Sequence, residues 1–421
     1  MKTTGLQMIM LLATTGLFAQ WEPVPVGTSS AAVTSMFAFA DTVMAGTDGD
    51  GIFKTTNLGN SWSDISGNIG NTFINDIRGG GGPLVIWAST DNGAYFTIDQ
   101  NDYLNCASGL PSNDITYFWF GNSNSASTEW ALGTNGEGLF TAPDVIGPWN
   151  YAGNGLSGNG LFINDLSGYD EDDDWFAVLA TNNGVYFSVD DLLNWTPKSN
   201  GLSGDQLIVK RIACLGSMVV IATHGGCFYT VDQGDTWDAL FPDEKFNSLL
   251  IYPTQTGINF FVIGESGYYS PNLSDFYPID LTNVPGEVIS IATTSTHLFV
   301  GTQEEKQGVK SGGIYRIPID QLITTIPDDP DLPETGLAQN FPNPFSTYSN
   351  ITYTLARAGN VSLRILDFAG REVRTMVNEF QTAGIQQVKF EPGDLPAGTY
   401  YFILNAEGSN PVTRKMILIS K

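Results

Sequence analysis

The stretch Thr230-Val231-Asp232-Gln233-Gly234-Asp235-Thr236-Trp237 lies between two short runs of mostly apolar residues, 226–229 and 237–240. This pattern predicts a hairpin turn. The Asp232 carboxylate can accept hydrogen bonds from turn amides, and Gly234 can adopt a positive φ without steric cost. Trp237 can bury a large ring beneath the turn. None of these roles is catalytic, so the stretch predicts a fold and leaves the function open.

Weaker copies of this pattern recur along the chain. Each copy has a short pair such as Gly-Thr or Ala-Thr, then a turn, then a strand that begins Gly-apolar-aromatic; the seven copies fall at 46–53, 89–95, 133–140, 180–186, 222–228, 264–269 and 301–315. The second residues of successive copies are 37 to 47 residues apart. A four-stranded propeller blade takes about 40 to 45 residues. The repeat therefore predicts one blade per copy.

The sequence after residue 20 predicts an all-β protein, because no stretch of ten or more residues there shows helical periodicity. We expect a seven-bladed β-propeller over residues 21–321, followed by a small immunoglobulin-like β-sandwich. The seventh copy runs into a linker and lacks its outer strand. Residues 21–24 have the same pattern as 62–65, which follow a turn of the repeat. We therefore expect the N-terminal strand to close the last blade.

The turn itself resembles the Asp-box found in sialidases, sortilin-type receptors, xyloglucan-active glycosidases and a photosystem II assembly factor. The residues that carry this resemblance are Asp232, Gly234 and Trp237 in the best copy, and Asn57, Gly59 and Trp62 in the first. In those families the box closes the outer hairpin of a propeller blade. The resemblance thus implies a structural role for these six residues.

The N-terminal segment 1–20 reads as a signal peptide, with Lys2 before a short apolar core and a cleavage site after Ala19, next to Gln20. We expect no membrane span in the mature chain. The formal net charge of −26 argues against nucleic acid as a partner. Three cysteines do not make a disulfide framework. No motif for a cofactor is present, and we expect none to be bound.

Residues 322–336 are rich in proline and acidic residues and predict a linker. The segment 337–421 carries four motifs in order: 340–345 (NFPNPF), 361–373, 395–401 (LPAGTYY) and 413–419 (TRKMILI). Together they resemble the type A C-terminal sorting domain of type IX secretion cargo. The resemblance implies recognition by the type IX translocon, and a secreted or outer-membrane surface location in a Gram-negative bacterium of the Bacteroidota type.

Candidate ligand residues come from three Asn-Asp pairs near the starts of predicted innermost strands. If the strand registers match, Asp76, Asp114 and Asp165 lie at one level around the channel mouth and could bind a cation or a cationic ligand. The alternative is that they are turn-capping residues, repeated because the blades are repeated. Asp170, Asp172 and Asp174 could hold calcium loosely, although the run lacks the glycine and spacing of a dedicated calcium loop.

Two classes of function remain open. A sialidase needs three arginines around the substrate carboxylate, and the predicted propeller contains only Arg78, Arg211 and Arg316. His224 and His297 are the only histidines. We expect a non-enzymatic propeller that binds protein or glycan, with aromatic candidates for sugar stacking at Trp119, Phe120, Trp130 and Trp175. The alternative is a glycoside hydrolase, sialidase-like or xyloglucan-active-like, that uses paired carboxylates at the channel.

Overall fold

The computed structural model describes residues 21–26, 30–69, 73–80, 85–122, 128–171, 174–253, 258–271, 273, 276–322, 336–355, 359–368, 370–381, 384–406, 409 and 411–419. The predicted signal segment, with Ala19 and Gln20, lies outside these residues, as does most of the predicted linker. In the described residues almost every regular element is a strand, and the only helices are three short 3₁₀ turns, η1 (Gly158–Leu161), η2 (Gly204–Leu207) and η3 (Ile319–Gln321). The prediction of an all-β protein is confirmed.

Before residue 322 the described strands form seven sheets. The first three sheets are β2 (Val33–Phe39), β3 (Thr42–Thr47), β4 (Ile52–Thr55) and β5 (Ser63–Asp64); β6 (Ile74–Gly80), β7 (Val85–Thr90), β8 (Gly93–Thr97) and β9 (Leu104–Asn105); and β10 (Ile115–Asn122), β11 (Thr128–Thr134), β12 (Leu139–Ala142) and β13 (Asn150–Tyr151). The next three are β14 (Ile163–Glu171), β15 (Asp174–Thr181), β16 (Gly184–Ser188) and β17 (Thr196–Pro197); β18 (Val209–Leu215), β19 (Met218–Thr223), β20 (Gly226–Thr230) and β21 (Asp238–Pro242); and β22 (Phe246–Pro253), β23 (Ile258–Gly264), β24 (Gly267–Ser270) and β25 (Tyr277–Pro278). The last sheet contains β26 (Glu287–Thr293), β27 (His297–Lys306), β28 (Val309–Ser311), β29 (Ile314–Pro318) and β1 (Glu22–Pro23).

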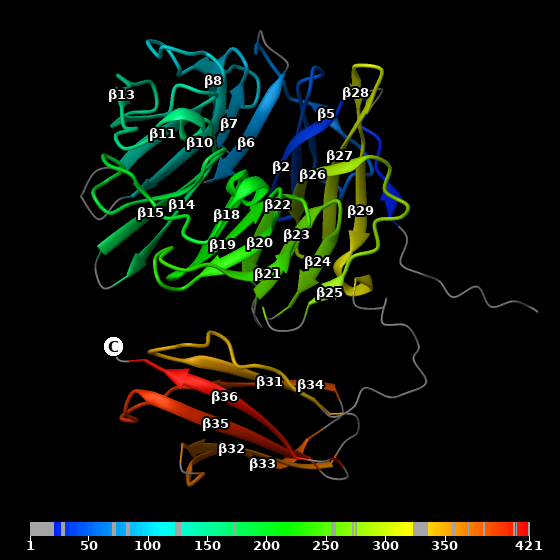
Figure 1. The fold of residues 1–421 in the computed structure, drawn as a ribbon. Helices are drawn as coiled ribbons and strands as arrows, with labels where there is room; N and C mark the ends of the chain where they lie inside the picture. The colour runs from blue at the N-terminus through cyan, green and yellow to red at the C-terminus, as the bar shows by residue number, and fades with distance from the viewer. Residues whose placement is uncertain are drawn as a thin grey trace, which may run out of the picture.

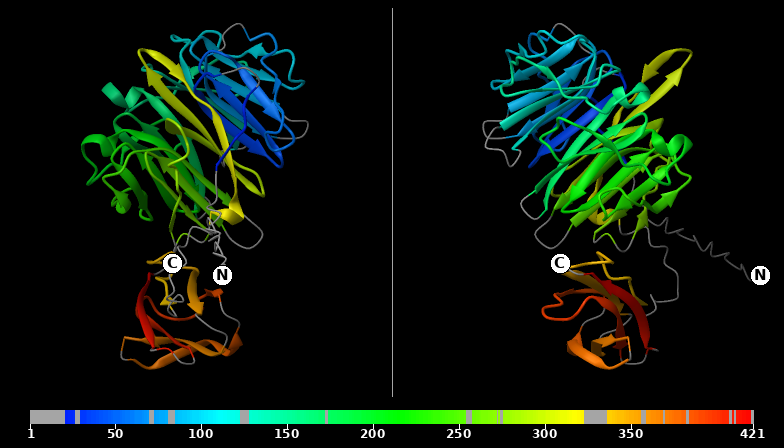
Figure 2. Two further views of the ribbon diagram at one scale, coloured as in Figure 1. Left: turned by 90° about the vertical axis from the view of Figure 1, so that its right-hand side faces the viewer. Right: turned by 60° about the vertical axis from the view of Figure 1, so that its left-hand side comes forward.

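The seven sheets close into a ring. The first strands of successive sheets pack against one another in the order β2, β6, β10, β14, β18, β22, β26, and β26 packs against β2 again. Figures 1 and 2 show the sheets arranged radially around these strands, with the short outer strands at the rim. The ring is held by apolar residues between neighbouring sheets. For example, the second strands β3 and β19 are buried along nearly their whole length, so both faces of each are covered by protein.

The last sheet joins the two ends of the ring-forming segment. Strand β1 pairs antiparallel with β29, so that Glu22 lies opposite Arg316 and Pro23 opposite Tyr315. Val24 and Val26, which follow β1, are buried in one apolar cluster with Val33 of the first sheet and Ile314 of the last. Because residues 21–26 complete a sheet whose other strands begin at residue 287, closure of the ring depends on contacts between distant parts of the chain.

The turn at 230–237 has the hydrogen bonds that its sequence predicts. Asp232 Oδ1 accepts from Thr230 Oγ1 (2.6 Å) and from the Thr236 amide (3.0 Å), and Asp232 Oδ2 accepts from Thr236 Oγ1 (2.6 Å). The Gly234 amide donates to Thr230 Oγ1, and Gly234 has a φ of 79°. The turn is therefore locked by one carboxylate and one hydroxyl.

The same pattern of bonds recurs at Asn57 in the first sheet. Asn57 Oδ1 accepts from Thr55 Oγ1 (2.9 Å) and from the Ser61 amide (3.0 Å), and Asn57 Nδ2 donates to Ser61 Oγ (2.9 Å). The Gly59 amide donates to Thr55 Oγ1. An asparagine at this position can thus make bonds to the same groups as Asp232. The difference is that the Asn57 amide donates to the Ser61 hydroxyl, whereas the Asp232 carboxylate accepts from the Thr236 hydroxyl.

The tryptophans that follow these turns fasten each sheet to the one before it. Trp237 Nε1 donates to the Lys198 carbonyl (2.8 Å), and Trp195 Nε1 donates to the Ala152 carbonyl (2.8 Å). In both cases the acceptor lies just after the outer strand of the preceding sheet. Trp62 packs among the residues after β1, with Val24 and Val26. Burial of these rings at the rim supplies contacts that the short outer strands cannot make by pairing alone.

The C-terminal segment forms two further sheets around one core. One sheet contains β30 (Gly336–Leu337), β31 (Ser349–Leu355) and β34 (Gly384–Phe390); the other contains β32 (Gly359–Asp367), β33 (Glu372–Gln381), β35 (Gly398–Ala406) and β36 (Val412–Leu418). Ile351, Phe390 and Phe402 are fully buried in the cluster that both sheets share. In Figure 1 these strands, in orange and red, form a body separate from the ring. Alternation of buried and exposed residues along β32 and β35 follows from packing one face of each strand on this core.

Candidate functional site

Every innermost strand carries the same irregularity near its start. In each of the seven strands the pairing with the second strand shifts after the first or second residue, at Val33, Ile74, Ile115, Ile163, Val209, Phe246 and Val288. The residue that follows each of these is skipped by the pairing, as in a β-bulge. The skipped residues are Thr34, Asn75, Thr116, Asn164, Lys210, Asn247 and Ile289.

Five of the skipped residues tie their strand to the next sheet. Asn75, Asn164 and Asn247 donate from Nδ2 to the carbonyls of Ile115 (2.8 Å), Val209 (2.7 Å) and Val288 (2.9 Å), and the Thr34 and Thr116 hydroxyls donate to the carbonyls of Ile74 and Ile163. At the last sheet the skipped residue is Ile289, which cannot donate, and Ser290 Oγ donates to the Val33 carbonyl instead (2.7 Å). A chain of side-chain bonds thus runs around most of the channel.

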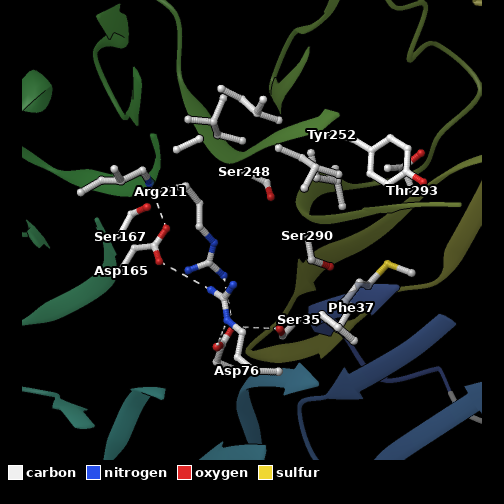
Figure 3. Close-up of a pocket in the computed structure, with 18 of the residues that line it drawn as sticks. Ser35, Phe37, Asp76, Asp165, Ser167, Arg211, Ser248, Tyr252, Ser290 and Thr293 are labelled. Atoms are coloured by element: carbon white, nitrogen blue, oxygen red, sulfur yellow. Dashed lines mark hydrogen bonds and ion pairs between the residues drawn. The ribbon is translucent and has the colours of Figure 1, made fainter. Parts of the chain in front are cut away.

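The residues after the skipped positions place four charged groups inside the channel. Asp76 Oδ2 lies 2.8 Å from Arg78 Nε, and Asp165 Oδ1 lies 3.5 Å from Arg78 Nη2. Arg211 Nη2 lies 3.7 Å from Asp76 Oδ1. Figure 3 shows Asp76, Asp165 and Arg211 converging from three sheets. Two carboxylates and two guanidinium groups balance in charge, which is the condition for burying them together.

Backbone amides and one hydroxyl group donate further hydrogen bonds to the carboxylates of Asp76 and Asp165. Ser35 Oγ donates to Asp76 Oδ1 (3.0 Å), while the amides of Leu166 and Ile212 donate to the two oxygens of Asp165. The side chains of Asp76 and Asp165 are only 3% and 5% exposed. These two aspartates therefore hold sheets together, although both also line the channel.

Arg78 stands at the centre of this network. Its guanidinium lies over the Tyr117 ring, 4.6 Å from the ring centroid. Burial lowers the pKa of Arg78, but the Asp76 and Asp165 carboxylates raise it by more, so that its pKa lies above the ordinary value. Burial has the opposite effect on Tyr117, whose pKa it raises well above the usual range. Arg78 is thus fixed as a cation and Tyr117 as a neutral phenol.

The structure brings Asp76 and Asp165 together and places Asp114 elsewhere. Asp114 precedes β10, and the position in β10 that corresponds to Asp76 is occupied by Tyr117. The Asp114 carboxylate accepts from Asn75 Nδ2 (3.2 Å) and Asn135 Nδ2 (2.7 Å), at the edge of the channel. The three aspartates therefore do not share one level, because the registers of the three Asn-Asp pairs do not match.

Two cavities open on opposite sides of the charged network. The first, which we name the arginine cavity, has a volume of about 400 Å³ and is lined by later residues of the inner strands, including Phe37, Arg78, Tyr252 and Thr293. Figure 3 shows these walls around the network. The second, which we name the lysine cavity, has a volume of about 390 Å³ and is lined by the skipped residues together with His224, Lys245, Glu287 and Gln303.

The other candidates fall at separate places. Asp170 lies in β14 opposite Trp175, Asp172 lies outside the described residues, and the side chain of Asp174 is not described. Within the described ranges no three His, Cys, Asp or Glu side chains are close enough to hold a metal ion. Arg316 pairs with Glu22 at the rim (2.9 Å), away from Arg78 and Arg211. His297 lies in the last sheet, so the two histidines do not form one site.

The four aromatic candidates for sugar stacking form two groups. Trp119 and Trp175 pack on each other with ring centroids 5.6 Å apart. Phe120 and Trp130 pack with Trp87, which is buried, and Phe120 is 41% exposed. Most of this aromatic surface contributes to packing between strands, and Phe120 is the member that offers a face to solvent.

Sequence reasoning missed the lysine cavity. Lys210, His224, Lys245 and Glu287 are far apart in the sequence and come from three sheets. One signal was available: Lys210 stands in its inner strand at the position that Asn75 and Asn164 occupy in theirs. A charged residue at a repeat position that Asn or Thr fills in five of the seven strands indicates a local function.

Comparisons with known proteins identify the C-terminal part of the chain. Residues 339–419 match the family described as the secretion system C-terminal sorting domain. A domain of this family indicates secretion through the type IX system. A search of curated proteins finds no match. In the described residues, no helix is long and apolar enough to cross a membrane.

Solved structures support the propeller fold of the remainder. The extracellular domain of a hybrid two-component system from B. thetaiotaomicron is 13% identical, with a TM-score of 0.55 over 93% of this chain and 55% of that chain. This chain thus spans little more than half the length of that protein. A structure described as YCF48 bound to D1 peptide is 14% identical, with a TM-score of 0.52 over 71% of this chain and 96% of that chain. An ancestral GH74 enzyme is 15% identical, with a TM-score of 0.52 over 94% and 63%. At these identities the likeness concerns the fold alone.

Proposed function

We propose that this protein is a secreted, non-enzymatic propeller that binds protein or glycan outside the cell. In this proposal each of the seven sheets is one blade, the turns at 55–62 and 230–237 are Asp-boxes, and residues 21–321 are the binding domain. Residues 1–20 act as a signal peptide that is cleaved after Ala19, and residues 322–336 are a linker. The type IX translocon then recognises residues 337–421 and delivers the protein to the cell surface or the medium.

We also assign an immunoglobulin-like architecture to the sorting domain. Its two sheets share one core, and the Tyr400 hydroxyl donates to the Pro396 carbonyl, four residues upstream (2.8 Å). A tyrosine that bonds back to nearby backbone is a recurrent feature of such sandwiches. This compact shape suits a tag that must be recognised in the folded state.

One observation carries the non-enzymatic assignment. Both carboxylates that the channel holds near its centre are ion-paired with arginines, nearly inaccessible to solvent and hydrogen-bonded to protein groups through both oxygens. A glycosidase needs two carboxyl groups that reach the substrate, about 5 to 9.5 Å apart. Asp76 and Asp165 contact protein groups instead. Their arrangement favours a scaffold over a hydrolase.

A screen of the mature chain, residues 21–421, tests the proposal. We expect binding on a glycan array or to a surface protein, and no release of reducing sugar from a panel of polysaccharides and aryl glycosides. Asp76→Asn and Asp165→Asn variants serve as the matched pair. Turnover by the wild type that both variants lose while they remain folded would establish the alternative, a secreted glycoside hydrolase with paired channel carboxylates.

A further inference from the structure

The lysine cavity contains a positive charge that nothing in its wall balances. Lys210 lines this cavity, and no hydrogen bond or ion pair to its ammonium group is found among the described residues. Lys210 is partly buried, and the cations Arg211 and Lys245 are nearby. Burial, with the help of these two cations, lowers the pKa of Lys210 to about 8. A partly buried ammonium without a partner is unfavourable, so its presence calls for an explanation.

The other charges in the cavity cancel. Lys245 Nζ lies 2.5 Å from Glu287 Oε1, which makes one neutral pair. Arg211 is paired with Asp76 in the channel network. Burial, Lys210 and Lys245 lower the pKa of His224, in that order, so its ring is neutral at pH 7. Among the residues that line the cavity, about one positive charge is left, which matches a ligand with a single negative charge; the Asp114 carboxylate bonds Asn75 Nδ2 at the cavity edge.

The remaining wall offers acceptors for hydroxyl groups. Asn75, Asn164 and Asn247 each use both N–H groups of the side-chain amide: one bonds the carbonyl of the next sheet, and the other bonds Asp114, Asn182 and Glu287 respectively. The three amide oxygens accept no hydrogen bond from the described residues. An amide oxygen accepts and cannot donate. A ligand that satisfies these atoms must bring its own O–H or N–H donors.

We propose that the lysine cavity binds a sugar acid, in which one carboxylate pairs with Lys210 and neighbouring hydroxyls donate to the amide oxygens of Asn75, Asn164 and Asn247. This inference rests on the proposed function, because it names the chemical class that a binding propeller recognises. The sugar acid is either free or the terminal unit of a glycan. A volume of about 390 Å³ is at the lower end of ligand cavities and admits one such unit.

The charge of the ligand and the number of its hydrogen-bond donors favour a sugar acid over phosphate and over a neutral sugar. A phosphate dianion would bring two negative charges to a cavity with one unbalanced cation, and would also face the Glu287 carboxylate. Phosphate also has few donors for three amide oxygens. A neutral sugar would satisfy the oxygens and leave Lys210 unpaired.

Isothermal titration of the mature chain at pH 7 tests the proposal, with glucuronate and galacturonate as the sugar acids. Glucose and inorganic phosphate are the comparison ligands. We expect one of the sugar acids to bind at one site at least tenfold more tightly than glucose or phosphate. The Lys210→Met variant should bind it at least tenfold more weakly, and Lys210→Arg should recover part of the loss. Lys389→Met, which removes an exposed lysine of the sorting domain, is the matched control and should bind as the wild type does.

Three results would overturn the inference: glucose binding as tightly as the sugar acids, phosphate binding more tightly, or an affinity that Lys210→Met leaves unchanged. Absence of binding by both sugar acids, as monosaccharides and as terminal units of oligosaccharides, would do the same. Comparison of the free acid with its β-linked trisaccharide separates the two sources of the ligand. A parallel assay for released sugar keeps this test separate from the proposed function. Turnover would refute the non-enzymatic role while the effect of Lys210→Met on affinity still decides the inference.

Discussion

The indole nitrogen of Trp21 donates a 2.7 Å hydrogen bond to the carbonyl oxygen of Asp280, which lies 259 residues later in the chain. Trp195 makes the equivalent bond to Ala152 within the ring. Both rings are buried, and both acceptors follow the outer strand of the preceding sheet. The junction between the two ends of the ring-forming segment thus uses the same contact as an internal junction.

We therefore predict that Trp21 matters for stability as much as Trp195 does. Replacing either residue with phenylalanine removes one hydrogen bond and should lower the free energy of unfolding by about 1 kcal/mol. Replacement with alanine should cost about 3 to 5 kcal/mol. Urea unfolding of the four variants is the measurement. A much smaller loss for Trp21→Ala than for Trp195→Ala would mean that the last sheet opens before the rest of the ring.

Asp76 is predicted to be a structural residue. Asp76→Asn leaves Arg78 with Asp165 as its carboxylate partner and removes the carboxylate that pairs with Arg211. Breaking a buried ion pair in this way should cost about 3 to 5 kcal/mol. Asp114→Asn is the control: Asp114 is only half-buried and bonds two asparagines, so this change should cost less than about 1 kcal/mol. Equal stability of Asp76→Asn and the wild type would contradict the assignment.

The first sheet provides an internal control for the turn at Asp232. Because Asn57 makes the corresponding bonds, Asp232→Asn should be nearly neutral at pH 7, whereas Asp232→Ala should cost about 1 to 3 kcal/mol. Unfolding curves at pH 7 compare the two variants directly. Similar losses in both would show that the carboxylate charge, and not the bonding pattern, stabilises the turn.

The wild type and Asp232→Asn should also differ in how their stability depends on pH below about pH 4. Burial raises the pKa of Asp232, and hydrogen bonds from Thr230 and Thr236 lower it by more, so that it lies below the ordinary value. Stability from such a carboxylate is present above the unfolded pKa, about 4, and is lost as pH falls through the folded value. Between pH 4 and 2, the wild type should therefore lose stability relative to Asp232→Asn. Parallel curves across this range would refute the prediction.

Lys210 predicts a second rise of stability with pH, in the alkaline range. Its pKa of about 8 in the folded protein is below the ordinary 10.5, so the unfolded chain binds this proton more tightly. The free energy of unfolding should rise from pH 8 towards 10.5 by an amount on the order of 2 kcal/mol relative to Lys210→Met. Sugar-acid binding should weaken over the same range, because the ammonium loses its charge. The groups facing Lys210 are Arg211, His224, Lys245 and Glu287, and of these only His224 titrates near neutrality.

The fold could be predicted from sequence to the level of individual strands. The predicted copies at 46–53 and 222–228, for example, coincide with the end of β3 and the start of β4, and with the end of β19 and the start of β20. The reason is that each strand carries a local signal: an apolar start, a Gly-rich turn, and a Gly-apolar-aromatic partner. The Trp237 contact with Lys198 follows from the same repeat, because a large ring after a turn must find a neighbouring sheet.

The channel could not be predicted to the same level. Asn113-Asp114 has the same residue types as Asn75-Asp76, but the two pairs lie on opposite sides of the apolar residue that begins the strand. Asn75 follows Ile74, whereas Asp114 precedes Ile115. The position in β10 that corresponds to Asp76 is therefore occupied by Tyr117. The lysine cavity depends on which side chains remain unpaired after folding; the repeat pattern marks Lys210 as an exception, but it does not show which residues surround Lys210.

The antiparallel pair of β1 with β29 also sets the order of folding. Tyr315 must be synthesised and exported before Pro23 can find its partner. Formation of this pair requires closure of a loop of nearly the whole ring, which is entropically slow compared with a hairpin. Each of the other sheets of the ring forms from strands that are consecutive in the sequence, so these sheets can assemble before the last sheet is complete. The ring is therefore completed last, at the sheet in which its first and last strands meet.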